Sequence, residues 1–133
     1  VGAKAYAKKY KDRLDKHIVG AESDFGAGRI WKFDTNFAQE KLVLAEAMHK
    51  VLEPLGIGRG DNNASGGPDI GPLRELGVPA VTLKQNGWDY FDYHHTADDT
   101  LDKIDKSDIA QNVAAYAAFV WMAANIDGHF RKD

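Results

Sequence analysis

Short apolar segments with strand character alternate with helical segments along this chain, and this alternation restricts the fold more than any other feature. Strand character is found at residues 17–24, 30–34 and 78–83, where β-branched and apolar side chains are frequent. Alternating helices and buried strands are typical of layered α/β proteins. We therefore predict one α/β domain over residues 1–133, with a mostly parallel sheet flanked by helices on both faces.

Three of the expected helices lie before the last strand. Residues 3–16 contain good helix formers and no internal Gly or Pro. Residues 38–53 form a second predicted helix, which Pro54 and the glycine that follows end. A short helix is expected at 70–76, after a glycine-rich loop.

The strongest helical pattern is the last one. Asp105 or Ser107 supplies an N-cap side chain, and the pattern runs through Asn125. Apolar residues recur at helical spacing along this segment: Ile109, Val113, Tyr116, Val120 and Ala124.

Composition excludes several classes of protein. With 133 residues the chain is long enough for one domain with a core, and its formal net charge of −3 argues against a nucleic-acid partner. The absence of cysteine excludes disulfides, zinc ribbons and thiol nucleophiles. No apolar run approaches the ~18 residues expected of a membrane span. The serines lie in no nucleophile-elbow context, so a serine hydrolase is poorly supported.

The densest group of chemically active side chains is the segment 90–100, Tyr-Phe-Asp-Tyr-His-His-Thr-Ala-Asp-Asp-Thr. Imidazole is the commonest protein ligand for zinc and titrates near neutrality, so His94 and His95 are candidate metal ligands. The alternative is a surface loop whose Asp and Thr side chains cap a following turn. His17, His49 and His129 are weaker candidates, and we expect His49 to be a partly buried helix residue.

Two further segments lie where a sheet of this kind binds ligands, beyond the carboxyl ends of its strands. Asp24 ends the first predicted strand, and the histidine loop follows the strand at 78–83, so both can reach one rim of the sheet. Asp24 could instead be satisfied by loop amides. The loop Ser65-Gly66-Gly67-Pro68-Asp69 could line a pocket with backbone N–H groups or be a simple turn.

Taken in order, four segments resemble the carboxy-terminal portion of co-catalytic di-zinc exopeptidases of the carboxypeptidase Q type. They are AESDFG (21–26), LEPLGI (52–57), SGGPDIGPLRELGVPAVTL (65–83) and YFDYHHTADDTLDKID (90–105). The resemblance implies an enzyme with two zinc ions that hydrolyses peptide substrates with metal-activated water.

The resemblance also implies residue roles. Asp24 would be a terminal ligand of one zinc and His95 of the other, with His95 preferred because it directly precedes the hydroxyl residue of the motif. The residues expected to brace the ligand loop or line the pocket are Tyr93, His94, Asp99, Thr100, Gly66, Gly67 and Asp69. Related aminopeptidases have a tyrosine before the ligand histidine, a position that His94 takes here.

The remaining residues of such a site, including its general-base glutamate, would lie before residue 1. The chain begins with Val1 rather than Met, and we expect a piece of a longer protein whose amino-terminal half is its partner. No catalytic residue is then present in this chain, and we predict that it is inactive alone. Similar proteins are often exported, and exposed sheet edges lead us to expect self-association, including a homo-oligomer.

Two alternatives remain at this point. The chain could be a non-catalytic domain that kept the fold for partner binding or assembly. It could also come from a relative of the same fold that uses one metal ion or acts as an aminoacyl cyclase. Residues upstream of Val1 would distinguish these cases.

Overall fold

The computed structural model describes residues 1–132, and its central element is strand β1 (Ile30–Asn36). β1 pairs in parallel with the short strand β2 (Gly58–Arg59) and antiparallel with β3 (Ala80–Gln85), so the sheet order is β2-β1-β3. The predicted α/β class is confirmed. The expectation of a mostly parallel sheet is correct only in part, because the longer pairing, β1 with β3, is antiparallel.

The segment predicted as a strand at 17–24 forms only an isolated parallel bridge, between Gly20 and Ala80. The Gly20 N–H donates to the Pro79 carbonyl and the Val81 N–H donates to the Gly20 carbonyl, both at 2.9 Å. The prediction of a full strand is wrong, because this segment has a pairing partner on one side only among the described residues and touches it at one position.

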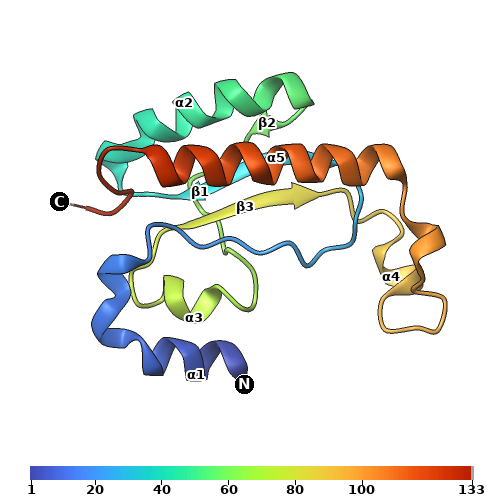
Figure 1. The fold of residues 1–133 in the computed structure, drawn as a ribbon, viewed down its shortest axis with the longest axis horizontal. Coiled ribbons are helices and arrows are strands. Elements are labelled where there is room, and N and C mark those ends of the chain that lie inside the picture. The colour runs from blue at the N-terminus through green and yellow to red at the C-terminus, as the bar shows by residue number, and fades with distance from the viewer. Residues whose placement is uncertain (133) are drawn as a thin grey trace.

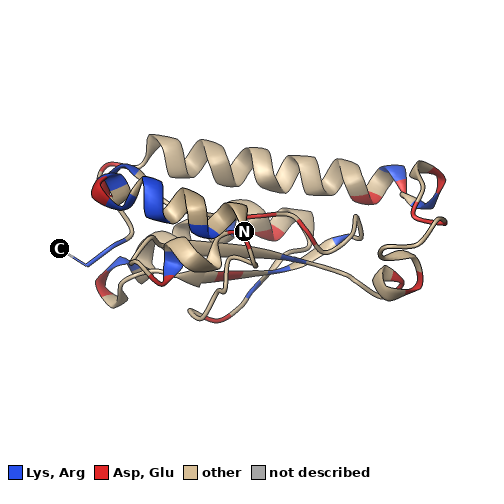
Figure 2. Cartoon of the chain, turned by 90° about the horizontal axis from the view of Figure 1, so that it is seen from below, with Lys and Arg blue, Asp and Glu red and all other residues tan. Residues whose placement is uncertain are grey.

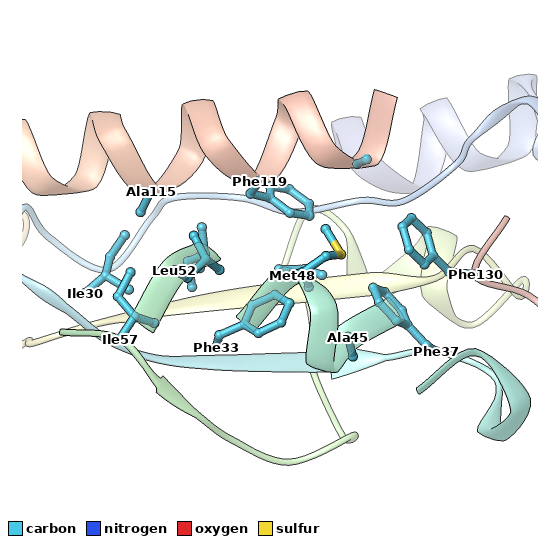
Figure 3. Close-up of a cluster of buried hydrophobic side chains, with 13 residues drawn as sticks. Ile30, Phe33, Phe37, Ala45, Met48, Leu52, Ile57, Ala115, Phe119 and Phe130 are labelled. Atoms are coloured by element: carbon cyan, nitrogen blue, oxygen red, sulfur yellow. The ribbon is translucent and has the colours of Figure 1, made fainter. Parts of the chain in front are cut away.

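Helices α2 (Leu42–Leu52) and α5 (Lys106–Asn125) lie on the same face of the sheet (Figure 1). Their inward side chains meet those of β1 and β3 in one buried cluster, and Figure 3 shows much of it lying between α5 and β1. The largest fully buried members of this cluster are Phe33, Phe130, Ile30, Leu52 and Ile57.

A second, smaller cluster joins the remaining helices. Ala7 of α1 (Gly2–Lys9) packs with Leu73 of α3 (Gly71–Arg74) and with Val78, and Leu14 lies against them. These helices lie beyond β3, at the edge of the sheet opposite β2 (Figure 1).

Short helical turns complete the fold. They are η1 (Lys11–Lys16), η2 (Gln39–Lys41), η3 (Glu53–Leu55), α4 (Tyr90–Tyr93) and η4 (Leu101–Lys103). The predicted helix 3–16 is therefore split at Tyr10 into α1 and η1, whereas 38–53 is found as η2, α2 and η3 in succession. Gly56 ends that succession with a left-handed φ of 79°, which glycine adopts without steric cost.

The last helix has the predicted cap, and most of its periodic apolar residues are not on its buried face. The Asp105 carboxylate accepts hydrogen bonds from the backbone N–H groups of Ser107 and Asp108. The buried residues of α5 are Gln111, Asn112, Ala115, Phe119 and Ala123, whereas Ile109, Val113 and Val120 of the periodic set are exposed. Most of the apolar residues that show the helical period therefore lie outside the buried face. No helix in the described part of the chain combines the length and hydropathy that crossing a membrane requires.

Candidate functional site

A cleft of about 570 Å³ opens at the end of the molecule where β3 ends and α5 begins. Two segments far apart in the sequence line it, one before β1 and one after β3. We call residues 23–28 the inner wall and residues 86–108 the outer wall. Their cleft-lining members are Ser23, Asp24, Gly26, Ala27 and Gly28, and Asn86, Trp88, Asp89, Tyr90, Tyr93, His94, His95, Asp99, Lys103, Ile104, Asp105 and Asp108.

Buried side-chain amides hold the inner wall in place. The Gln85 amide at the end of β3 donates to the Ser23 hydroxyl (3.0 Å), to the Gly26 carbonyl (2.9 Å) and to the Asn112 amide oxygen (2.8 Å). The Asn112 amide in turn donates to the Gly28 carbonyl at 3.0 Å. Because Gln85 and Asn112 are buried, these bonds lie away from competing water, and they determine the backbone path around Asp24.

A second contact from α5 fixes the residue before the inner wall. The Tyr116 hydroxyl donates to the Glu22 carbonyl at 2.7 Å, and burial raises the pKa of the Tyr116 phenol. The Glu22 carboxylate accepts from the backbone N–H groups of Asp69 (2.7 Å) and Ile70 (3.3 Å). Glu22 therefore ties the inner wall to the loop before α3.

The two walls approach so closely that two positions require glycine. A Cβ atom at Gly28 would lie 2.0 Å from the Asn86 carbonyl oxygen, and one at Gly87 would lie 2.0 Å from the Phe25 ring. Since Gly28 and Phe25 belong to the inner wall and Asn86 and Gly87 to the outer wall, the absence of side chains lets the two segments pack together.

Aromatic rings connect the walls above this contact. Phe25 stacks on Tyr90 with ring centroids 4.4 Å apart, and the Tyr90 hydroxyl donates to the Asp24 carbonyl at 3.4 Å. The Tyr90 ring also lies 4.7 Å from His94, whose imidazole stacks on that of His95 at 3.8 Å. A continuous row of rings therefore runs from the residue after Asp24 to the second histidine.

His95 has an unusual backbone conformation. Its φ is 60°, in the left-handed region, and no other residue besides glycine has a positive φ among those described. Such residues are uncommon and cluster at functional sites, where the surrounding structure holds them in place. Two hydrogen bonds across His95 hold this conformation, because the Thr96 N–H and the Thr96 hydroxyl both donate to the Tyr93 carbonyl.

The cleft is acidic. Five carboxylates line it, from Asp24, Asp89, Asp99, Asp105 and Asp108, against the single ammonium group of Lys103. Figure 2 shows acidic residues gathered at this end of the molecule. The lining therefore favours cations.

Asp102 lies in the outer wall without lining the cleft. A hydrogen bond from Lys103 and another from Thr100 lower the pKa of this exposed carboxyl to about 2.

Comparison with known proteins identifies the family. The model of peptidase family M28 matches residues 1–120, which is most of the chain. The chain belongs to peptidase family M28. The crystal structure of a peptidase M28 precursor from Shewanella amazonensis SB2B superposes with a TM-score of 0.93 at 52% identity, covering 98% of this chain and 30% of that one.

Curated relatives give the same assignment and show a difference in length. Carboxypeptidase Q from Rattus norvegicus is 25% identical over 127 residues, and that from Homo sapiens is 24% identical over the same length. Each alignment covers 96% of this M28 chain and 27% of the relative. The chain thus spans just over a quarter of the length of the relatives that it matches.

The structure of this M28 chain brings most of the predicted site residues together. Asp24 and His95 line the same cleft, as do Tyr93, His94 and Asp99. Thr100 lies in the outer wall without lining the cleft, and its hydroxyl donates to the Asp102 carboxylate at 2.6 Å.

The glycine loop lies elsewhere. Gly66, Gly67 and Asp69 do not line the cleft. The Asp69 N–H donates to the Glu22 carboxylate, which would lie 1.9 Å from a Cβ atom at Gly67. Gly67 also has a left-handed φ of 94°, so this loop needs glycine for its own turn and for close approach to Glu22. His49, as expected, is partly buried, and its Nε2 lies 3.0 Å from the Ile57 carbonyl oxygen.

The donor set fits part of a zinc site. A carboxylate and an imidazole are both common zinc ligands, and among the described residues no side chain donates a hydrogen bond to the Asp24 carboxylate. In the same part of the chain, no group of three or more His, Cys, Asp or Glu residues is placed to hold a metal ion. Zinc needs about four ligands, so these two donors would require others.

Sequence reasoning missed the residues that support the inner wall. Gln85, Asn112 and Tyr116 are separated from Asp24 along the chain and carry no motif. One signal was available, since Gln111 and Asn112 are adjacent amides in an otherwise apolar, Ala-rich helix. Polar side chains on such a helix are found buried when they have hydrogen-bond partners.

Proposed function

We propose that this chain supplies one side of the active site of a zinc-dependent exopeptidase that hydrolyses short peptides with free termini. The observation that carries the proposal is the convergence of Asp24 and His95 on one acidic cleft from two distant segments. Membership of peptidase family M28 supports the reaction class.

Each candidate ligand has a defined role in this proposal. The Asp24 carboxylate supplies an oxygen donor for one zinc ion, and the His95 imidazole supplies a nitrogen donor for the other. Two zinc ions held there would supply Lewis-acid polarisation of the peptide carbonyl and a water of lowered pKa. The other carboxylates of the cleft add negative potential that favours retention of divalent cations.

The neighbouring residues orient these donors. The aromatic row from Phe25 to His94 connects the two walls, and so restricts the separation between Asp24 and His95. The hydrogen bonds of Thr96 to Tyr93 hold the left-handed turn at His95. Residues that orient ligands in this way typically change metal affinity by about 10–100-fold when they are replaced.

The test uses the native polypeptide, by which we mean the longest natural product that contains this chain. Asp24→Asn and His95→Gln should each remove bound zinc and reduce dipeptide hydrolysis by more than the ~10–100-fold typical of orienting residues. His17→Gln is the matched control, since it changes an imidazole that does not line the cleft, and it should retain the metal. Metal content by mass spectrometry and hydrolysis rates with and without a chelator are the measurements.

Two results would contradict the proposal. Full zinc content in both Asp24→Asn and His95→Gln would remove these residues from the site. A native polypeptide without chelator-sensitive hydrolysis of any dipeptide would favour a binding or assembly role for the same fold. We also expect the isolated 133 residues to be inactive, because they provide one candidate donor for each of two zinc ions.

A further inference from the structure

Asn86 and Gly87 form the only Asn-Gly pair in the sequence, and they lie where the outer wall begins. Asn86 is exposed, and it lines the cleft. Asparagine is a thermolabile residue, because the backbone nitrogen of the next residue can attack its side-chain amide. A glycine in that next position has no Cβ atom to hinder the attack. The pair therefore combines a reactive sequence with a place in the candidate site.

The attacking atom would be the Gly87 backbone nitrogen. Its N–H group makes no hydrogen bond to any residue in the described range 1–132, so its proton can pass to solvent without the loss of such a bond. The backbone on either side is restricted, since the Asn86 N–H donates to the Arg29 carbonyl at 2.9 Å and Gly87 lies against the Phe25 ring. The nitrogen is thus available and held in place.

The attacked group would be the side-chain amide of Asn86. Its oxygen, Oδ1, accepts a hydrogen bond from the Trp88 N–H at 3.1 Å, which is the bond of an Asx turn. This bond closes a ring of atoms that contains the Gly87 nitrogen, so the amide carbon Cγ is held close to that nitrogen. Negative charge develops on Oδ1 when Cγ is attacked, and an N–H donor already directed at that oxygen stabilises the charge.

We propose that Asn86 is a site of spontaneous deamidation through a cyclic imide formed with Gly87. The Gly87 nitrogen forms a bond to Asn86 Cγ and gives its proton to solvent. The Cγ–Nδ2 bond breaks, and the amide nitrogen leaves as ammonia with a proton taken from solvent. Water then opens the imide: attack on Cγ gives aspartate, and attack on the backbone carbonyl carbon gives isoaspartate, in which the chain continues through the side chain. No atom is oxidised or reduced.

The isoaspartate product changes the contact between the two walls. A Cβ atom at Gly28 would lie 2.0 Å from the Asn86 carbonyl oxygen, so the walls have no space for a longer backbone at this point. Isoaspartate adds one carbon to that backbone and a carboxylate to the acidic cleft. We expect it to displace the outer wall, and with it His95, relative to Asp24.

The effect of this displacement on zinc rests on the proposed function. Replacing residues that orient metal ligands typically lowers metal affinity by about 10–100-fold, and we expect a loss of that size in the isoaspartate form. The deamidation itself does not depend on the proposed function, since it needs only Asn86, Gly87 and water.

The test incubates the native polypeptide at neutral and at mildly alkaline pH and follows each asparagine by peptide mapping with mass spectrometry. Asn86 should lose its amide first, and faster at the higher pH, because the attack requires the Gly87 nitrogen to lose its proton. Asn63 is the internal control: it is exposed as well, but the next residue, Ala64, has a Cβ atom and its N–H donates to the Thr35 carbonyl at 2.8 Å. Asn63 should keep its amide over the same period.

Two variants separate the consequences. Asn86→Gln keeps an amide but lengthens the side chain by one carbon, which disfavours closure of the ring, so it should stay unmodified and keep its initial zinc affinity throughout the incubation. Asn86→Asp adds the new charge without lengthening the backbone. The isoaspartate fraction of the incubated protein should therefore bind zinc more weakly than Asn86→Asp.

Two results would overturn the deamidation site. One is an Asn86 that keeps its amide for as long as Asn63 does. The other is conversion in a synthetic peptide of residues 82–92 without conversion in the native polypeptide, which would show that the folded cleft prevents the attack. An isoaspartate fraction with unchanged zinc affinity would refute the displacement of the outer wall. A native polypeptide that binds no zinc before incubation would refute the proposed function instead, and the peptide map would still decide whether Asn86 deamidates.

Discussion

The two walls of the cleft are supported in different ways. The inner wall, which carries Asp24, is bound to the core by the buried amides of Gln85 and Asn112, from β3 and α5. The outer wall, which carries His95, is mostly exposed and is held by short-range bonds such as those of Thr96 to Tyr93. Segments with few buried contacts open at a lower free energy than segments tied to the core. The position of Asp24 therefore depends on the whole fold. The position of His95 depends on its own loop and on the stacking of Tyr90, in the same wall, on Phe25.

The largest expected effect comes from the inner wall. Gln85→Leu removes three hydrogen bonds and leaves the Gly26 carbonyl and the Asn112 amide oxygen without their donor. We expect the free energy of unfolding of the native polypeptide to fall by about 2–3 kcal/mol, measured by chemical denaturation. Lys84→Leu changes the exposed neighbour on the same strand and should stay within about 0.5 kcal/mol. An equal loss in both variants would refute the special role of the buried amides.

The next prediction tests whether the outer wall depends on its contact with the inner wall. Phe25→Ala removes the stacking partner of Tyr90, which contributes about 0.5–1.5 kcal/mol in aromatic pairs. Hydrogen exchange at the amides of His94 and Thr96 should become about fivefold to tenfold faster, as expected when the outer wall opens more often. Trp88→Ala in the same wall should not change this rate, because Trp88 is 91% exposed. Unchanged exchange in Phe25→Ala would show that the outer wall does not depend on the inner one.

The third effect concerns the junction between the outer wall and α5. Hydrogen bonds from Ser107 and Asp108 lower the pKa of the Asp105 carboxyl, so the ionised cap stabilises the folded state. This stabilisation is present above the ordinary pKa of 3.8 and is lost as the pH falls through the lowered value. Asp105→Ala should remove that part of the acid dependence and speed amide exchange at Ser107 and Asp108. An acid profile identical to that of the unmodified protein would contradict the cap.

The smallest effect is confined to the exposed loop. Lys103→Met should raise the pKa of Asp102 from about 2 toward 3.8, because it removes the main hydrogen bond to that carboxyl. The measurement is a carboxyl NMR titration. Since Asp102 is exposed, we expect no measurable change in global stability. A concerted loss of global stability would show that the outer wall is coupled to the core more tightly than its contacts indicate.

Local sequence patterns were sufficient for several elements. The N-cap at Asp105, the length of α5, the existence of α2 and β1, and the concentration of ligand-type side chains around His95 all depend on residues close together in the chain. Capping, helix propensity and turn chemistry act over a few residues, so a single sequence contains their signal.

Only the tertiary structure decided which surfaces meet. Helix α5 carries apolar residues on two sides, and periodicity alone could not choose between the buried side with Ala115 and Phe119 and the exposed side with Val113 and Val120. The antiparallel pairing of β3, the single bridge at Gly20 and the contacts of Gln85 with Asn112 likewise depend on partners distant in sequence. The chain alone therefore indicated a helix, a carboxylate and two histidines, and packing determined the face that the helix buries and the cleft that Asp24 and His95 both line. Burial is a property of the partner surface as much as of the residue, and no local pattern contains that information.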